Sequence, residues 1–248
     1  MKSGTFNALY RHEFHMEFRR WLSRKGVWMY VGALVVLALA ALTIWGGRGD
    51  FKPEYMLYAT YAFPYLVFGI SYRLVKREWS NGTYGWWLTL PFSRSKLMLA
   101  KYAASLAQAG LTLLVYFAAI VLLALYNAAL HGTTAEGVRS FGAVAAQYLL
   151  VVAAIAPFML SLGLLAGVLV RSRLKGISPL VWISFGVLGN ALNWLNIARS
   201  ADSNGDYEMS LFSSHSALAF WISFPVIWLL AALMLAGSVQ ICKKFMTL

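Results

Sequence analysis

Charged residues are scarce in this sequence: only 12% of its 248 residues are Asp, Glu, Lys or Arg, whereas a soluble domain typically has about 25%. Apolar residues make up 60% of the chain, and the mean hydropathy is +0.64. This composition excludes an ordinary soluble enzyme, and the 15% of aromatic residues excludes a disordered chain. The composition therefore favours a single transmembrane domain covering residues 1–248.

Several motifs are also missing. The single cysteine, Cys242, excludes a disulfide framework and a cysteine-rich metal site. The sequence has no G-x-x-x-x-G-K-[ST] motif, and no Gly-Lys pair, so the chain has no P-loop of its own. His12-Glu13-Phe14-His15 is one residue shorter than the zinc motif H-E-x-x-H, which needs its histidines four residues apart. We therefore predict no metal site, and we find no constellation of catalytic residues.

Six segments without Asp, Glu, Lys or Arg are long enough to cross a bilayer, for which a helix needs about 20 apolar residues. Their continuous apolar character favours helices over the alternating strands of a membrane barrel. We predict an all-α membrane protein with six transmembrane helices. The spans are expected near residues 27–46, 55–75, 102–127, 143–170, 177–198 and 217–241. The six charge-free segments, of which the second runs from Tyr55 to Tyr72, contain no Asp, Glu, Lys or Arg, and this absence argues against a proton- or sodium-coupled carrier.

Positive charges are concentrated on one side of the predicted spans. Seventeen of the 21 Lys and Arg residues precede the first span, follow the last, or lie in the second and fourth loops. Short loops rich in Lys and Arg stay in the cytoplasm, so both termini are predicted to be cytoplasmic. The net charge of +12 then marks the inner face of a membrane, and we expect no nucleic-acid partner.

Residues 1–26 carry aromatic and leucine side chains at steps of three and four, from Phe6 to Leu22. This spacing is typical of an amphipathic helix. We expect the helix to lie in the headgroup plane, with its basic side attracted to anionic lipid. The alternative is that this segment simply begins the first membrane helix.

The second cytoplasmic loop, residues 77–96, is too polar at its start to be a span. Thr83 is a candidate N-cap for a short helix, and Pro91 would end that helix. The expected members of the helix include Trp86, Trp87 and Leu90. Ser93 is a candidate cap for the next helix. Exposed aromatic residues in such a loop fit a membrane-interface belt or a docking surface equally well.

At these residues the sequence resembles the ABC-2 type permeases of ATP-binding-cassette exporters. The matching positions are Glu78, Gly82-Thr83, Leu90-Pro91-Phe92-Ser93-Arg94 and Lys101. In that family the loop forms a coupling helix that docks into a groove of a cytoplasmic ATPase, and an amphipathic elbow helix begins the chain. The resemblance thus implies a role in ATPase coupling for Glu78, Gly82, Thr83, Trp86, Trp87, Leu90 and Pro91. The family often has a charged or aliphatic residue where Trp86 and Trp87 stand.

The resemblance also implies partners and a function. Two copies of a separate ABC ATPase would bind ATP and Mg, with no cofactor in this chain, and a second permease, identical or paralogous, would complete the pathway. The compact size looks like bacterial permeases that export antimicrobial peptides or toxins, such as phenol-soluble modulins. We expect a subunit in the inner (plasma) membrane that exports an amphipathic or hydrophobic substrate, in particular a peptide. The alternatives are a drug or glycolipid exporter permease, a membrane-embedded enzyme, and a non-transporting sensor or scaffold subunit.

Small and polar residues within the predicted spans are candidates for helix packing or for the pathway. Gly163 and Gly167 form a G-x-x-x-G pair, which lets helices approach closely. Packing within the chain is favoured over a dimer interface. The other candidates are Asn190, Asn193 and Asn196, near the outer end of the fifth predicted span. Because Asn is costly in lipid, these side chains should bond neighbouring helices or line the mouth of a pathway.

Overall fold

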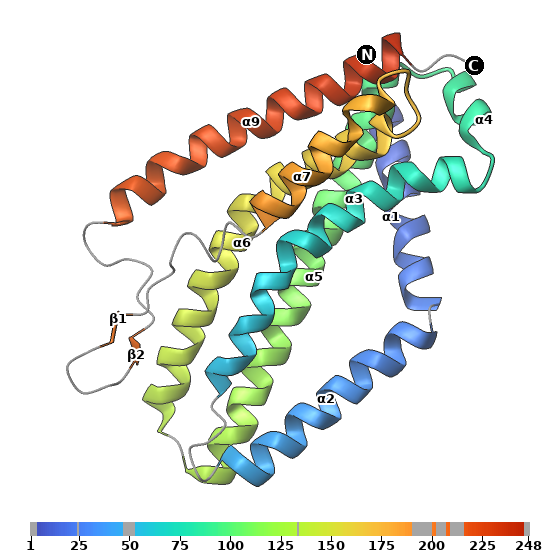
Figure 1. The fold of residues 1–248 in the computed structure, drawn as a ribbon. Helices are drawn as coiled ribbons and strands as arrows, with labels where there is room; N and C mark the ends of the chain where they lie inside the picture. The colour runs from blue at the N-terminus through green and yellow to red at the C-terminus, as the bar shows by residue number, and fades with distance from the viewer. Residues whose placement is uncertain are drawn as a thin grey trace.

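The molecule is a bundle of long helices, and the computed structural model describes residues 4–23, 25–46, 53–132, 134–189, 200–201, 207–208 and 216–245 (Figure 1). The helices are α1 (Gly4–Ser23), α2 (Lys25–Trp45), η2 (Pro53–Ala62), α3 (Phe63–Ser80), α4 (Tyr84–Thr89), α5 (Arg94–His131), α6 (Ala135–Leu169), η3 (Lys175–Ile177), α7 (Ser178–Gly189) and α9 (Ser216–Lys244). The strands β1 (Ser200–Ala201) and β2 (Tyr207–Glu208) pair antiparallel. Apart from this short pair, the described residues confirm the all-α class.

Among the described residues, four helices are long and apolar enough to cross a membrane: α2, α5, α6 and α9. They coincide with the first, third, fourth and sixth predicted spans. Helices α5 and α6 contain 38 and 35 residues, so each is much longer than the roughly 20 residues that a bilayer requires. The fifth predicted span begins with the 12 residues of α7, and its outer part, residues 190–198, lies outside the described residues.

The second predicted span differs from a continuous α-helix. Its first residues belong to the 3-10 helix η2, and α3 begins only at Phe63. Tyr55, Tyr58 and Tyr61 explain the difference, because side chains three residues apart eclipse one another in a 3-10 helix. Their rings stack, with centroids 6.3 and 6.2 Å apart. Pro64 lies in the first turn of α3, where its missing N–H leaves no helical hydrogen bond unmade.

Helix α6 forms the centre of the bundle and packs against α3, α5, α7 and α9. Helix α2 leaves the bundle and is exposed along most of its length. The start of α1, the end of α9 and the short helix α4 all lie at one end of the molecule, at the top of Figure 1. This end therefore gathers segments that are far apart in the sequence, and the candidate site lies there.

The two glycines of the predicted G-x-x-x-G pair lie where α6 crosses α3. A Cβ added at Gly163 would contact the hydroxyl of Ser71 and lie 2.5 Å from the carbonyl oxygen of Phe68. A Cβ added at Gly167 would lie 2.8 Å from the Cβ of Val75. Real Cβ atoms do not approach other atoms so closely, so the spacing of α3 and α6 depends on these glycines. The close approach is between helices of the same chain.

Candidate functional site

Lys101, near the start of α5, is completely buried. Its Nζ lies 2.8 Å from Oε1 of Glu13 in α1 and 2.8 Å from Oε1 of Glu78 in α3. A buried ammonium is tolerated only when it is paired and hydrogen-bonded, and these two carboxylates meet that condition. One lysine therefore joins three helices.

Arg77 extends this arrangement from the neighbouring position of α3. Its Nη2 lies 2.8 Å from Oε2 of Glu13 and 3.5 Å from Oε1 of Glu78, and its Nη1 pairs with Glu17. We call Glu13, Glu17, Arg77, Glu78 and Lys101 the ion cluster. No side chain in the cluster is more than 18% exposed. The cluster therefore holds three carboxylates and two cations in a largely buried position.

Few acidic residues lie in the basic segments of the chain. The chain has nine Asp and Glu residues, and only three of them lie in the segments 1–26, 73–101, 171–175 and 243–248, which hold seventeen of the basic residues. Those three are Glu13, Glu17 and Glu78, and all of them meet in the ion cluster. The acidic side chains of this basic end therefore all form ion pairs with Arg77 or Lys101.

Glu78 also fastens the predicted coupling loop. The hydroxyl of Thr83 donates a hydrogen bond to Oε2 of Glu78, at 2.8 Å. Gly82 adopts a left-handed backbone conformation with φ of +69°, which a glycine accepts without strain and which turns the chain from α3 into α4. Thr83 occupies the predicted N-cap position of α4, but its hydroxyl makes no cap bond to the helix. The nearby carboxylate accepts that hydroxyl instead.

The short helix α4 is close to the predicted one and ends at Thr89, so Leu90 follows the helix and Pro91 is exposed beyond it. Trp87 is only 4% exposed, contrary to the predicted exposed aromatic surface. Its ring lies 5.3 Å from Nζ of Lys101 in a cation–π contact. Burial over the lysine is favourable because the ring covers the ammonium while Glu13 and Glu78 satisfy it. The side chain of Trp86 lies outside the described residues.

The far end of the loop is anchored as well. Ser93 accepts a hydrogen bond from the backbone N–H of Lys96, which confirms its predicted role as a helix cap. Arg94 donates to the carbonyl oxygens of Cys242 and Lys243 at 2.6 and 3.0 Å. A cation at these terminal carbonyls suits the negative end of the α9 dipole. The loop is thereby attached to α9 in addition to α1, α3 and α5.

The charges of the cluster shift the pKa values of two members. Burial alone would raise the pKa of Glu78, but Lys101, the hydrogen bond from Thr83 and the charge of Arg77 together lower it below its ordinary value. Burial alone would lower the pKa of Arg77, and the three glutamates raise it instead. Both shifts favour the charged forms of Glu78 and Arg77.

Glu78 is the one cluster residue that the sequence analysis predicted as a site residue. Glu17 and Arg77 were not singled out, and Lys101 was noted only as a position of the family motif. Glu13 was noticed only within the incomplete zinc motif, where His12 and His15 prove to be exposed. The available signal was the spacing of Glu13 and Glu17, four residues apart on one face of α1. The predicted Asn190, Asn193 and Asn196 lie outside the described residues, so the structure does not place them.

The long apolar helices and the fastened loop define the class as a multi-pass helical membrane protein. A comparison with family models matches residues 14–172 to the ABC-2 family of transporter proteins. This match covers more than half of the chain, and the chain belongs to that family. The matched region contains four of the five cluster residues, since only Glu13 precedes it. A comparison with curated proteins finds no match.

Membership in the family indicates the role of the chain and the kinds of partner that it has. The chain is a transmembrane subunit of an ABC transporter. Such a subunit implies an ATP-binding partner and a pairing of permeases. The family match is independent of the geometry of the ion cluster.

Proposed function

We propose that this chain is the permease subunit of a bacterial ABC exporter that moves an amphipathic or hydrophobic peptide out of the cell. Energy would come from ATP hydrolysed by a separate cytoplasmic ATPase, present in two copies and holding the ATP and Mg²⁺. The chain itself would hold no catalytic residue and no cofactor. A second permease, identical or paralogous, would complete the pathway.

The proposed topology has six spans and cytoplasmic termini. Helices α2, α5, α6 and α9 supply four spans, η2 with α3 supplies another, and the segment that begins with α7 supplies the last. Two observations support it: the start of α1 and the end of α9 lie at the same end of the bundle (Figure 1), and the basic residues concentrate in the segments at that end. In this arrangement α1 is the elbow helix.

The ion cluster is the observation that carries the proposal. Helix α4 would be the coupling helix, and it is connected to α1, α3 and α5 through Glu78, Trp87 and Lys101. Breaking a buried ion pair by removing one partner typically costs about 3–5 kcal/mol. A displacement of α4 by the ATPase would therefore move these helices together, because sliding one alone would separate buried charges.

The apolar character of the spans supports the proposed substrate class. The six apolar segments contain no Asp, Glu, Lys or Arg, and ionisable residues within a membrane generally mark the pathways of ions and protons. A pathway formed by such helices suits a substrate with a substantial apolar surface. An amphipathic peptide, as exported by the phenol-soluble-modulin and antimicrobial-peptide group, meets this requirement.

Purification with partners tests the proposal. The tagged chain, extracted from its native membrane in mild detergent, should bring down an ABC ATPase in a ratio of two ATPases to two permeases. A chain that purifies alone, from a membrane in which such ATPases are intact, would contradict it. A complex that hydrolyses ATP but moves no substrate in vesicles would favour a sensor or scaffold subunit instead.

A further inference from the structure

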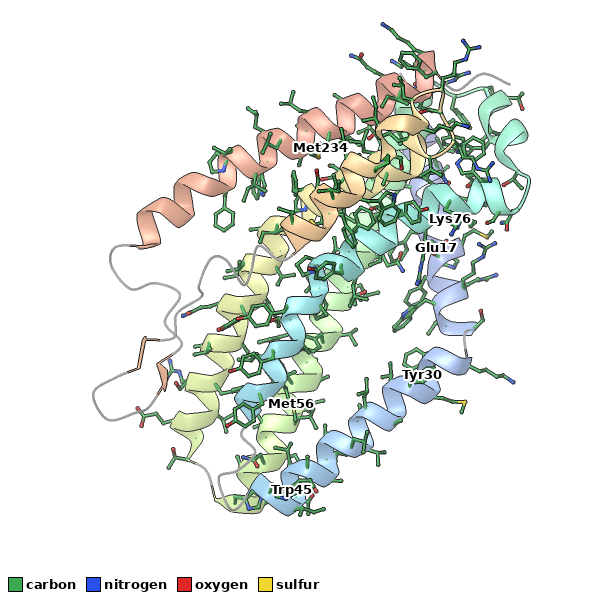
Figure 2. The ribbon with its side chains drawn as sticks, in the orientation of Figure 1. Glu17, Tyr30, Trp45, Met56, Lys76 and Met234 are labelled. Atoms are coloured by element: carbon green, nitrogen blue, oxygen red, sulfur yellow. The ribbon has the colours of Figure 1, made fainter. Side chains whose placement is uncertain are left out.

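A pocket of about 340 Å³ lies beside the ion cluster, between α1, α3 and α5. Four cations line it: Arg20 from α1 and Arg73, Lys76 and Arg77 from α3. Figure 2 shows Glu17 on α1 and Lys76 on α3 close to each other where these helices meet. The pocket therefore lies at the basic end of the bundle and is open to charged ligands.

Among the described residues, the positive charge of this pocket is neutralised only at Arg77. Its one acidic lining residue, Glu17, is already paired with Arg77. In the part of the chain that the structure describes, Arg20, Arg73 and Lys76 form no ion pair; Lys76 lies over the ring of Tyr72. The segments at this end contain no other carboxylate than those of the cluster. Three converging cations thus lack an anion.

One residue that lines the pocket also has a hydrogen-bond acceptor without a described partner. Gln108 of α5 lines it, and the side-chain oxygen of Gln108 is buried with no hydrogen-bond partner among the described residues. An ionised phosphodiester has only acceptors to offer this oxygen, whereas a hydroxyl can donate to it. The lining therefore matches a ligand that carries both an anionic phosphate and a hydroxyl.

An apolar track leads from the pocket along the membrane helices. Ile70 lines the pocket one turn before Arg73, and Leu66, one turn further along α3, is 52% exposed. On α5, Leu111 follows Gln108 by one turn and is also exposed. Residues three and four apart lie on one face of a helix, so both helices continue from polar to apolar on the side of the pocket. A ligand with acyl chains fits this succession.

We propose that the pocket binds the phosphodiester headgroup of an anionic, glycerol-type phospholipid of the inner leaflet. Basic pockets between membrane helices on the cytoplasmic side suit such headgroups. Free inorganic phosphate shares the anionic chemistry and carries a P–OH at neutral pH, but it lacks the acyl chains. The assignment goes beyond the exporter proposal, and only the choice of leaflet rests on the proposed topology, in which this end of the bundle is cytoplasmic.

Native mass spectrometry of the full chain in detergent, titrated with phosphatidylglycerol or phosphatidylcholine, tests the assignment. Wild type should bind phosphatidylglycerol more tightly. The double variant Arg73→Gln, Lys76→Gln should weaken that binding by about thirty-fold, since each surface cation contributes on the order of a factor of five. Lys243→Gln with Lys244→Gln removes two exposed cations from the end of α9, outside the pocket, and should leave the affinity unchanged.

Three results would overturn the assignment. The first is equal affinity for the two lipids, and the second is unchanged phosphatidylglycerol binding by the Arg73, Lys76 double variant. The third is complete displacement of the lipid by millimolar inorganic phosphate, which would make free phosphate the ligand. None of these measurements uses an ATPase or a transported substrate, so failure here is distinct from failure of the exporter proposal.

Discussion

At the scale of single residues, Lys101 is a fully buried cation. Its ammonium lies between the carboxylates of Glu13 and Glu78, under the ring of Trp87, with no exposure to solvent. Replacing it with Met keeps a similar length but leaves two buried carboxylates facing each other. The remaining cation, Arg77, already pairs with Glu17 and compensates only in part.

We predict that Lys101→Met lowers the free energy of unfolding by about 3 kcal/mol or more, as expected for a broken buried pair. Denaturation of the purified chain in detergent measures the change. Glu136→Gln, which alters an exposed acid at the start of α6, is the matched control and should stay within about 0.5 kcal/mol of wild type. Equal stability of Lys101→Met and the control would show that the cluster contributes nothing.

Acid should weaken the same cluster through Glu78. Its pKa in the folded chain is lower than its ordinary value of 4.5. A carboxyl with a lowered folded pKa contributes stability that is present above the ordinary pKa and is lost as pH falls through the folded pKa. The melting temperature of wild type should therefore fall as the pH drops below 4.5, and Glu78→Gln should reduce this fall. An identical pH dependence for wild type and Glu78→Gln would contradict the assigned pKa shift.

At the scale of elements, α3 and α6 cross closely because Gly163 and Gly167 have no side chain. Gly163→Ala places a methyl group against Ser71 and the backbone of Phe68, so we expect a loss of more than about 1 kcal/mol of stability. Gly142→Ala, in the same helix, meets no atom within 4 Å. This control should be neutral or stabilising by up to about 1 kcal/mol, as Ala is the better helix former. Thermal unfolding of both variants in detergent decides the matter.

The positions of the long elements could be predicted because charge in lipid is costly. Gaps between charged residues therefore locate α2, α5, α6 and α9 correctly. The local geometry of η2 was not predicted, since hydropathy does not distinguish a 3-10 helix from an α-helix. The three-residue spacing of Tyr55, Tyr58 and Tyr61 carried that information.

The candidate site could be predicted only in part. Glu78, Gly82 and Thr83 lie within six residues of one another, so a local sequence motif can identify them. The pairing of Lys101 with Glu13 joins residues 88 positions apart, and neither periodicity nor local propensity contains such a contact. For the same reason Trp87 was expected on the surface, because nothing near it in the sequence shows that a lysine lies beneath its ring.

At the scale of the whole molecule, the charges of the basic end fall into two groups: those paired within the ion cluster and the remaining cations. The few carboxylates at the basic end pair with Arg77 and Lys101 and tie α1, α3 and α5 into one unit. Most of the remaining cations at that end have no carboxylate in the neighbouring segments to pair with. Anionic lipid and the ATPase are the partners that such a surface would meet at the inner face of a membrane.

The central claim is that the ion cluster couples ATP hydrolysis to movement of the substrate. Inside-out vesicles that contain the permease and its ATPase allow both quantities to be measured, as labelled amphipathic peptide transported and phosphate released. The matched variants are Glu78→Gln and Glu136→Gln, compared at equal expression and equal amounts of bound ATPase. If wild-type vesicles move no peptide, the peptide proposal fails before coupling is tested.

The account predicts that Glu78→Gln lowers the peptide transported per ATP hydrolysed, while Glu136→Gln leaves the ratio at the wild-type value. The reason is that a neutral amide holds Lys101 less firmly than a carboxylate does, so movement of α4 is passed on less completely. A ratio for Glu78→Gln equal to that of wild type, with the ATPase still bound, would contradict the coupling role of the cluster.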